Sequence, residues 1–588
     1  MKRSGSDLVV RALEDEGIRY TFGIPGTHNI ELYDALGSSE VRPILITDEQ
    51  SAGFMADGYW RASGNLGCLN LVPGAGLTHA LSGIAEAFMD GIPMLVLGCG
   101  IRQDVRMAYQ LHDIDQLAIA APVTKATFRP MTGRDLYSTI RRACAIARAG
   151  TPGPVMVEVP VNLYLTRHAV EESDLHAPEP WLAPTATDEE LERATQWLTG
   201  KSARPLIYVG YGAAGAGEAL VGLAERLGAP VATTIQGKGV FPESHPLFLW
   251  NGFGNSAPPF AREVAARCDR LLAIGCRFSE VGTGGYGLTL PGPILHVDIN
   301  AEVLGRNFPA ELAIHAEAGT FVHQLLSRLG GTAEAGAGGG ADPRARIAEG
   351  HTGVLKEWEA NRSEDGVSPP FLLRRLHEVL GPETIFTTDS GNGTFLAMEC
   401  LRLERPGRFL APVDYSCMGY AIPAAIGAKL GRPAAPVVAL AGDGALLMTG
   451  LEALTAATEG IPVAIVVLRD KELAQISQFQ RTAFNRSVAS ALPDYDLAGL
   501  ASGLGIEYLT CKSDTEVDSI LDRTAAILAE GRPVIVDAAV DYTLKTYFTK
   551  GVVKTMLGRL PWKDRIRFVA RAVVRHVSGA SFGGDARE

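Results

Sequence analysis

The sequence predicts an α/β protein with three doubly wound parallel-sheet domains and a helical tail. Short apolar runs rich in β-branched residues alternate with helical patterns in three successive regions, which is typical of parallel sheets flanked by helices. A proline-rich stretch at 176–188 and a glycine- and alanine-rich stretch at 330–345 separate these regions. The chain has 588 residues, which is too long for a single hydrophobic core.

These boundaries define five segments. We expect an N-terminal domain at 1–180, a central domain at 188–330, a flexible linker and a following helix at 331–367, a third domain at 368–545 and a basic tail at 546–588. The runs expected to form strands include VRPILIT, GCLNLV, IPMLVLG and GPVMVEVP in the first domain, RPLIYV and ILHVD in the second, and ETIFTT, PVVALAG, PVAIVVL and RPVIVDAAV in the third.

Charge and cysteine content exclude several classes of protein. The formal net charge of -12 argues against a nucleic-acid partner, because phosphate binding requires clustered positive charge. The eight cysteines are scattered without a CxxC pair, so neither a zinc site nor a disulfide framework is expected. The first residues resemble an amphipathic helix with acids rather than a signal peptide, and no apolar run reaches the roughly 18 residues of a membrane span. We therefore expect a cytoplasmic protein.

Two acids follow two neighbouring strands of the third domain. Asp443 lies between two glycines after PVVALAG, and Asp470 comes directly after PVAIVVLR. Between them, Thr449 and Glu452 have the spacing of a capping box, which predicts a helix from Thr449 to a stop at Gly460. The two parallel strands should place both acids at one carboxyl edge, where α/β sheets bind ligands. Two oxygen ligands beside a phosphate site are typical of Mg²⁺.

Four ordered segments resemble the motifs of thiamine-diphosphate-dependent enzymes, closest to the acetolactate synthase and benzoylformate decarboxylase branch. The similarity extends over roughly residues 5–545. It implies that the first domain binds the pyrimidine of the cofactor and the third its diphosphate. The segments are TDEQSAGFMADGYWRASG, PGAGLTHALSGIAEAFMDGIPMLVLG, SCMGYAIPAAIGAKLGRP and the GDG of residues 442–444 with its acid 27 residues after Asp443.

The resemblance implies a role for each matched residue. Glu49 would be the catalytic glutamate that hydrogen-bonds the aminopyrimidine, and its apolar surroundings favour the protonated carboxyl. Met418 would bend the cofactor, and the carbonyl of Ser416 would accept from its amino group. The other implied cofactor contacts are Asn392, Gly393, Thr394, Gly442, Asp443, Gly444, Ala445, Asp470 and Glu472, and the implied metal ligands are Asp443, Asp470 and the backbone oxygen of Glu472.

Four of these assignments have a purely structural alternative. Glu49 can be a surface helix-cap glutamate. Asp443 can be a turn cap, residues 390–394 a plain turn and Met418 a core side chain. The sequence also departs from the family pattern, with Arg469 and Asp470 where relatives usually carry two asparagines and Glu472 where they usually carry a glycine. The extra carboxylate increases the negative charge at the metal site.

The substrate pocket is less clearly marked. His28, His79, Gln110 and His112 fall near positions that face the reactive carbon in relatives, and converging histidines suit proton transfer. Packing or hydrogen-bonded histidines are the alternative. The resemblance implies a cofactor shared between subunits, hence a homodimer or tetramer acting on small carbonyl substrates.

The central domain and the tail leave alternatives open. The segment VGYGAAG contains a GxGxxG without an acidic partner at the usual spacing. In the family this domain binds flavin adenine dinucleotide (FAD), an adenine nucleotide or nothing. Residues 545–575 hold nine Lys or Arg and one acid, and Trp562, Ile566, Val569 and Val573 share one apolar helical face. We expect this tail to cover the active site as a lid, with contact to an anionic membrane as the alternative.

We therefore expect a thiamine-diphosphate and Mg²⁺ enzyme that cleaves or decarboxylates a 2-keto acid or related dicarbonyl. The remaining enamine would be joined to a second carbonyl, as in acetolactate synthase. The alternatives are a decarboxylase or C–C lyase without carboligation, a flavin- or nucleotide-dependent oxidoreductase, and a catalytically silent subunit.

Overall fold

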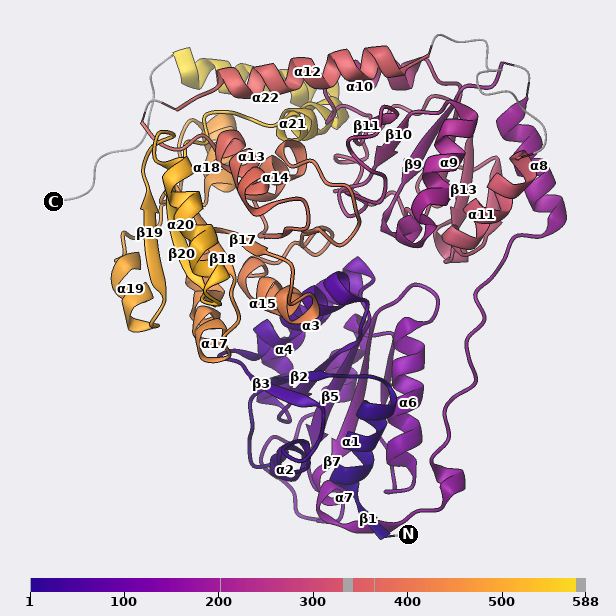
Figure 1. Cartoon of the computed structure of the whole chain (residues 1–588), viewed down its shortest axis with the longest axis vertical. Helices are drawn as coiled ribbons and strands as arrows, with labels where there is room; N and C mark the ends of the chain where they lie inside the picture. The colour runs from indigo at the N-terminus through magenta and orange to yellow at the C-terminus, as the bar shows by residue number, and fades with distance from the viewer. Residues whose placement is uncertain (1, 201, 331–341, 364, 578–588) are drawn as a thin grey trace.

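A computed structural model of the chain describes residues 2–200, 202–330, 342–363 and 365–577. In these residues the chain forms three domains, each with a six-stranded parallel sheet and helices on both faces, which confirms the predicted fold class (Figure 1). Most of the expected flexible linker, at 331–341, lies outside the described residues.

The N-terminal domain has the strand order β3-β2-β4-β5-β7-β6. A short antiparallel pair of β1 and β8 ties its first residues to its last strand. Its strands are β1 (Lys2–Ser4), β2 (Tyr20–Gly23), β3 (Arg42–Leu45), β4 (Gly67–Leu71), β5 (Met94–Gly100), β6 (Ala126–Phe128), β7 (Pro154–Pro160) and β8 (Arg167–Ala169). Its helices are α1 (Gly5–Asp15), α2 (Ile30–Leu36), α3 (Glu49–Ser63), α4 (Ala75–Asp90), α5 (Gln116–Ala120), α6 (Asp135–Arg148) and α7 (Val161–Leu165).

The central domain has the strand order β11-β10-β9-β12-β13-β14. Residues 175–187, which lead into it, form neither helix nor strand, as their prolines predict. The strands are β9 (Pro205–Val209), β10 (Val231–Thr233), β11 (Phe248–Asn251), β12 (Arg270–Ile274), β13 (Ile294–Asp298) and β14 (Leu312–His315). The helices are α8 (Asp188–Thr199), α9 (Gly217–Leu227), α10 (Pro259–Ala266) and α11 (Ala318–Leu329), followed after the gap by α12 (Arg344–Ala360).

The third domain has the strand order β16-β15-β17-β18-β20-β19. Its strands are β15 (Ile385–Thr388), β16 (Phe409–Leu410), β17 (Val437–Gly442), β18 (Ala464–Arg469), β19 (Glu507–Cys511) and β20 (Val534–Ala539). Its helices are α13 (Pro369–Leu380), α14 (Asn392–Cys400), α15 (Ala421–Gly431), α16 (Asp443–Thr449), α17 (Ala453–Thr458), α18 (Ala474–Phe484), α19 (Leu497–Gly503) and α20 (Val517–Ala529).

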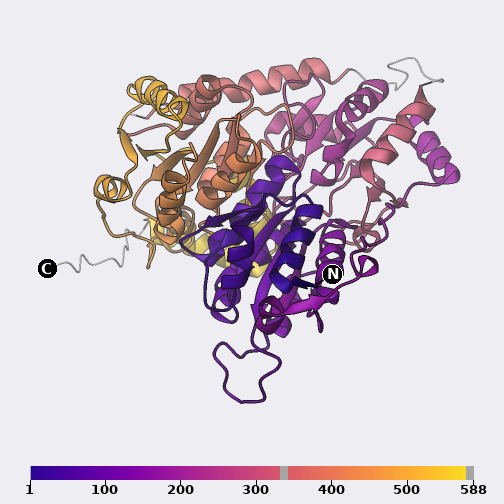
Figure 2. The ribbon, with the colours of Figure 1, turned by 60° about the horizontal axis from the view of Figure 1, so that its bottom comes forward.

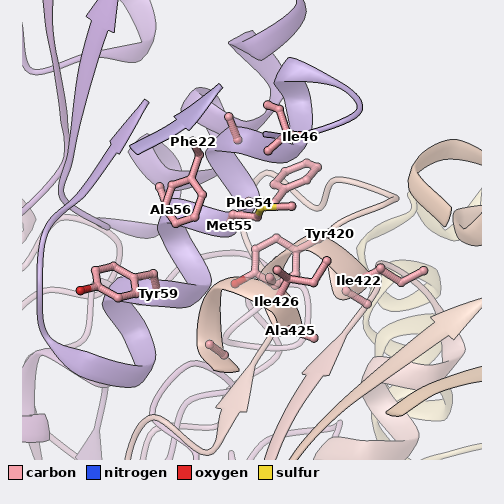
Figure 3. Packing of buried hydrophobic residues seen from close by; sticks show 14 of the residues in the cluster. Phe22, Ile46, Phe54, Met55, Ala56, Tyr59, Tyr420, Ile422, Ala425 and Ile426 are labelled. Carbon is pink, nitrogen blue, oxygen red and sulfur yellow. The ribbon is translucent and has the colours of Figure 1, made fainter. Parts of the chain in front are cut away.

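The N-terminal and third domains meet through α3 and α15, which lie backbone against backbone. A Cβ on Gly58 would lie 2.1 Å from the carbonyl oxygen of Ala424, and one on Gly427 would lie 1.9 Å from that of Met55. Both contacts require glycine. Figure 3 shows the apolar side chains of this contact, including Phe54 from α3 facing Tyr420, and together they form one buried cluster across the two domains.

The predicted helix from Thr449 to Gly460 is wrong in its start and in its capping box. A helix already begins at Asp443, and a 3₁₀ turn at Gly450–Glu452 separates α16 from α17. Thr449 Oγ1 donates to the carbonyl oxygen of Gly419 at 2.7 Å. The Glu452 carboxylate accepts from the backbone nitrogens of Thr47 and Asp48, in the N-terminal domain. A tertiary contact thus replaces the local cap.

The tail forms α21 (Tyr547–Arg559) and α22 (Trp562–Val577). Helix α21 packs against the core of the third domain through Phe548, and α22 contacts α18 while its side chains Trp562, Ile566 and Val573 are exposed. The side chain of Val569, which we expected on the same apolar face, lies outside the described set. Among the described residues, no helix is long and apolar enough to span a membrane.

Candidate active site

The two acids of the third domain lie at one edge of its sheet, as the sequence predicts. Strands β17 and β18 pair in parallel with Gly442 opposite Leu468, so Asp443 and Asp470 follow adjacent strand ends. Asp443 Oδ2 accepts from the backbone nitrogen of Lys471 at 2.7 Å. Burial raises the pKa of Asp443, and burial together with the charge of Asp443 raises the pKa of Asp470 to about 7. A divalent cation between the two would remove this repulsion.

A cavity of 130 Å³, which we call the cofactor cavity, opens at this edge. Its described walls come from the third domain alone, between Asp389 and Tyr542. It brings together nine of the predicted residues, namely Asn392, Gly393, Met418, Gly442, Asp443, Gly444, Ala445, Asp470 and Glu472. Thr394 and Ser416 instead line an adjoining cavity.

The third expected metal ligand is the backbone oxygen of Glu472, whose side chain lies elsewhere. Among the described residues, no group of three His, Cys, Asp or Glu side chains is arranged to hold a metal ion. The carboxylate of Glu472 turns away to Arg481, with Oε1 2.6 Å from a guanidinium nitrogen. Although burial opposes it, this bond holds the pKa of Glu472 below its usual range. Arg469, the other departure from the family pattern, is paired with Asp537 at 2.8 Å.

The N-terminus of α14 forms another wall of the cofactor cavity. Gly391 precedes the helix with a φ of 142°, a conformation that side chains other than glycine rarely adopt. The first backbone N–H groups of the nine-residue helix, from Asn392, have no partner within the helix. This end of the helix therefore offers donors and a positive dipole to a phosphate group.

The segment carrying Ser416 and Met418 is held by acids that the sequence analysis missed. Ser416 has a φ of 66°. The buried Asp389 accepts from the backbone nitrogen of Gly419 at 2.7 Å, and burial raises its pKa to about 6. Glu86, on α4, accepts from the backbone nitrogen of Cys417 at 2.9 Å. A carboxylate directly before SGNGT was the available signal for Asp389, whereas Glu86 lies too far along the chain to be linked from sequence.

Glu49 and the predicted histidines lie in the N-terminal domain, outside the walls of the cofactor cavity. Glu49 begins α3, and its Oε2 lies 3.3 Å from Nδ1 of His79. The rings of His28 and His112 face each other edge-on with centroids 5.4 Å apart. Burial and, to a smaller extent, the charge of His112 lower the pKa of His28.

Gln110 and His112 belong to a long loop between β5 and α5. Residues 101–115 form no helix or strand and are mostly exposed, and Figure 2 shows the loop reaching away from the domain. Gln110 bonds within the loop, to the carbonyl oxygen of Arg102 at 3.3 Å. The buried Gln116 bridges the base of the loop, donating to the carbonyl oxygen of Cys99 at 2.7 Å and accepting from Gly74.

Comparison with known proteins agrees with this architecture. The chain matches the thiamine pyrophosphate enzyme N-terminal TPP binding domain over residues 3–119, the central domain over 191–325 and the C-terminal TPP binding domain over 389–538. It is 31% identical to the probable acetolactate synthase large subunit of Methanocaldococcus jannaschii, covering 91% of this chain and 92% of that protein. It is 28% identical to the acetolactate synthase large subunit of Haemophilus influenzae, covering 93% of this chain and 96% of the relative. The chain belongs to the thiamine pyrophosphate enzyme family, in the acetolactate synthase branch.

The residues of the cofactor cavity suit the cofactor of this family, thiamine diphosphate. The buried Asp443 and the half-buried Asp470, whose charges repel one another, offer oxygen ligands to a cation. The neighbouring N-terminus of α14 offers N–H donors to phosphate oxygens. The apolar side chain of Met418 lies on the same cavity wall.

A further cavity of 460 Å³, which we call the central cavity, lies between the central domain and the N-terminal domain, with Trp60 and Arg148 of the N-terminal domain among its walls. The glycines of the GxGxxG, Gly210, Gly212 and Gly215, line it. Asp298, at the end of β13 and far beyond the usual spacing from these glycines, also lines this cavity. Burial raises its pKa to about 6. The cavity thus combines a glycine-rich turn with a buried acid.

Proposed function

We propose that this enzyme works as a homodimer, or a tetramer of such dimers, with the cofactor cavity of one copy completed by Glu49 of another. The proposal rests on the observation that the described walls of the cofactor cavity come from the third domain alone. Both family domains are present in the chain, yet its own Glu49 is not among those walls. A second copy would supply the missing carboxyl.

Exposed apolar side chains support this assembly. Leu447, Met448, Leu451 and Leu454 follow the cofactor cavity along α16 and α17, and all are exposed. The loop at 101–115 presents Met107 and Tyr109, which are 74% and 99% exposed. Exposed apolar surface of this kind marks protein interfaces. The adjacent Glu452 links α17 to the start of α3, so the exposed face lies beside Glu49.

Within the completed site, each predicted residue has a role. Asp443, Asp470 and the backbone oxygen of Glu472 would hold Mg²⁺, and the N-terminus of α14 with Asn392, Gly393 and Thr394 would bind the diphosphate. The Ser416 carbonyl would orient the aminopyrimidine, and Met418 would impose the bent shape. Thiamine diphosphate supplies a nucleophilic carbon that adds to a carbonyl and stabilises the charge left when carbon dioxide departs.

Side chains of the N-terminal domain would carry out the proton transfers of the reaction. Glu49 holds or releases a proton at Oε2, next to His79 Nδ1. The lowered pKa of His28 keeps its ring neutral at pH 7, where it can accept a proton from the substrate. We propose that the reaction joins the acyl unit of one 2-keto acid to a second carbonyl, as the names of the relatives indicate. The eight cysteines are free, which suits a cytoplasmic enzyme.

Pyruvate turnover with thiamine diphosphate and Mg²⁺, with analysis of the products, tests this proposal. Glu49→Gln should lower kcat by about 10²–10⁴, the usual contribution of a proton-transfer group. The matched control is Glu40→Gln, an exposed acid of the same domain. Acetolactate formed by the wild type and lost in Glu49→Gln supports carboligation, and acetaldehyde alone supports the decarboxylase alternative. Equal turnover by Glu49→Gln and wild type would refute the role of Glu49.

For the central cavity we propose an adenine dinucleotide, with FAD as the first candidate. The observation in favour is that Asp298 lines the same cavity as the glycine-rich turn, where its carboxylate would accept from a ribose hydroxyl. The visible absorbance of the purified protein and of the nucleotide released on denaturation tests it. Asp298→Ala should reduce the bound nucleotide, and a colourless wild type that does not take up added FAD would exclude the flavin.

A further inference from the structure

A second cavity adjoins the cofactor cavity and is much larger. Its volume is 640 Å³, against 130 Å³ for the cofactor cavity. Ser390, Gly391 and Gln475 line both. The two cavities are therefore neighbours, and a substrate held at the cofactor would have the second cavity beside it. We call this second space the apolar cavity.

The walls of the apolar cavity are mainly hydrocarbon. Phe395 and Phe548 stack with ring centroids 4.3 Å apart, and Phe479 contributes a third aromatic ring. Among the described lining residues, Glu280 alone carries a charge. Such a surface gains free energy by burying apolar groups and offers little compensation to a second carboxylate or a sugar.

Helix α21 forms one side of the apolar cavity. Its lining residues Phe548, Val552, Val553 and Leu557 recur at helical spacing along one face, while Lys554 on the opposite side is exposed. The first turn of the helix is tied to α14, because Glu399 accepts from the backbone nitrogen of Phe548 at 2.7 Å. The cavity is therefore bounded by a defined secondary structure element rather than by a surface loop.

We propose that the natural carbonyl substrate is a 2-keto acid with a large apolar side chain, an alkyl chain of several carbons or an aromatic ring, which occupies the apolar cavity. This inference rests on the proposed function and specifies its substrate class. Thr394 and Ser416, which would contact the cofactor, also line the apolar cavity, so a bound cofactor would take part of its volume. The methyl group of pyruvate would still leave walls such as Phe479, Val552 and Leu557 without contacts, whereas pockets of 300–1,000 Å³ hold drug-sized ligands. Each buried methylene contributes about 0.8 kcal/mol, which corresponds to about fourfold in affinity or in kcat/KM.

The experiment uses the holoenzyme with unbranched 2-keto acids of three to eight carbons and with phenylpyruvate. We expect kcat/KM for carbon dioxide release to rise about fourfold per methylene until the cavity is full. Val552→Trp fills the cavity and should reduce the ratio of kcat/KM for the eight-carbon over the four-carbon substrate at least tenfold. Lys554→Trp places the same bulk on the exposed side of α21 and should preserve the ratio. Val553→Phe is the milder second variant if Val552→Trp fails to fold.

Binding separates this inference from the proposed reaction. Calorimetry with Glu49→Gln holoenzyme measures the affinity of the same acids without depending on turnover. If affinity rises with chain length while wild type turns over none of the acids, the substrate-class inference is supported and the proposed reaction fails. If affinity and kcat/KM are flat or fall with chain length in wild type, the inference is overturned. It is also overturned if Val552→Trp folds and leaves the ratio unchanged.

Discussion

The carboxyl of Glu399 should make the attachment of α21 depend on pH. This side chain is buried beneath the first turn of the helix and accepts from the backbone nitrogens of Tyr547 and Phe548. Burial is the largest influence and raises the pKa of Glu399 from 4.5 to about 8, although the two N–H donors and Lys550 oppose the shift and Glu357 adds to it. Once α21 detaches, water reaches the carboxyl and its pKa returns to the ordinary value.

The direction of the effect follows from this difference. Between pH 4.5 and about 8 the attached state keeps a proton that the detached state releases. The free energy of detachment therefore falls as pH rises, by about 1.4 kcal/mol per pH unit, or about tenfold in the opening equilibrium. The stabilisation is fully present below pH 4.5 and is lost once the pH has passed the folded-state value. Glu399→Gln cannot ionise and should remove this slope.

Hydrogen exchange of the α21 backbone, corrected for the intrinsic pH dependence, measures this equilibrium in the full chain. In wild type we expect protection to fall about tenfold per unit from pH 5.5 to 8, because each unit is worth about 1.4 kcal/mol. In Glu399→Gln we expect lower protection at pH 5.5, since one acceptor oxygen is lost, and no slope. Glu302→Gln, an exposed acid of the central domain, is the control. The same slope in wild type and Glu399→Gln would refute the argument.

Three further substitutions test a buried ion-pair cluster, an expected metal ligand and the proposed subunit interface. The side chain of Arg61 is 4% exposed and bonds Asp57 and Asp90 at 2.7 and 2.8 Å. Arg61→Met should therefore lower the free energy of unfolding, measured in urea, by about 3–5 kcal/mol. A loss below about 1 kcal/mol would mean that the two acids find other partners. Asp443→Asn should abolish the rise in Tm that thiamine diphosphate with Mg²⁺ produces in wild type, and addition of a chelator to wild type should reverse that rise; a full shift in the variant would exclude Asp443 as a ligand. Leu451→Asp places a charge on the exposed apolar face of the 3₁₀ turn before α17 and should yield inactive monomers with unchanged circular dichroism, as measured by light scattering; an intact dimer would move the interface elsewhere.

The position of Asp443 and Asp470 was predictable because it depends on local rules. Two consecutive parallel strands with a short helix between them must end at the same edge of the sheet, whatever surrounds them. The same reasoning failed at Thr449 and Glu452, whose spacing satisfied the capping-box pattern. Glu452 instead accepts from Thr47, 405 positions earlier in the chain, and no local pattern carries that information.

The sequence by itself determined the three α/β domains, the family, and the acids and glycines that surround the cofactor cavity. These features follow from hydrophobic periodicity and short motifs, whose physical meaning is contained within a few neighbouring residues. Only the tertiary structure decided which side chains support them. Glu86 reaches Cys417 across two domains, and α21 encloses an apolar cavity beside the cofactor cavity. Such contacts depend on how distant segments pack, because a buried polar group must pair with whichever partner the packing brings to it.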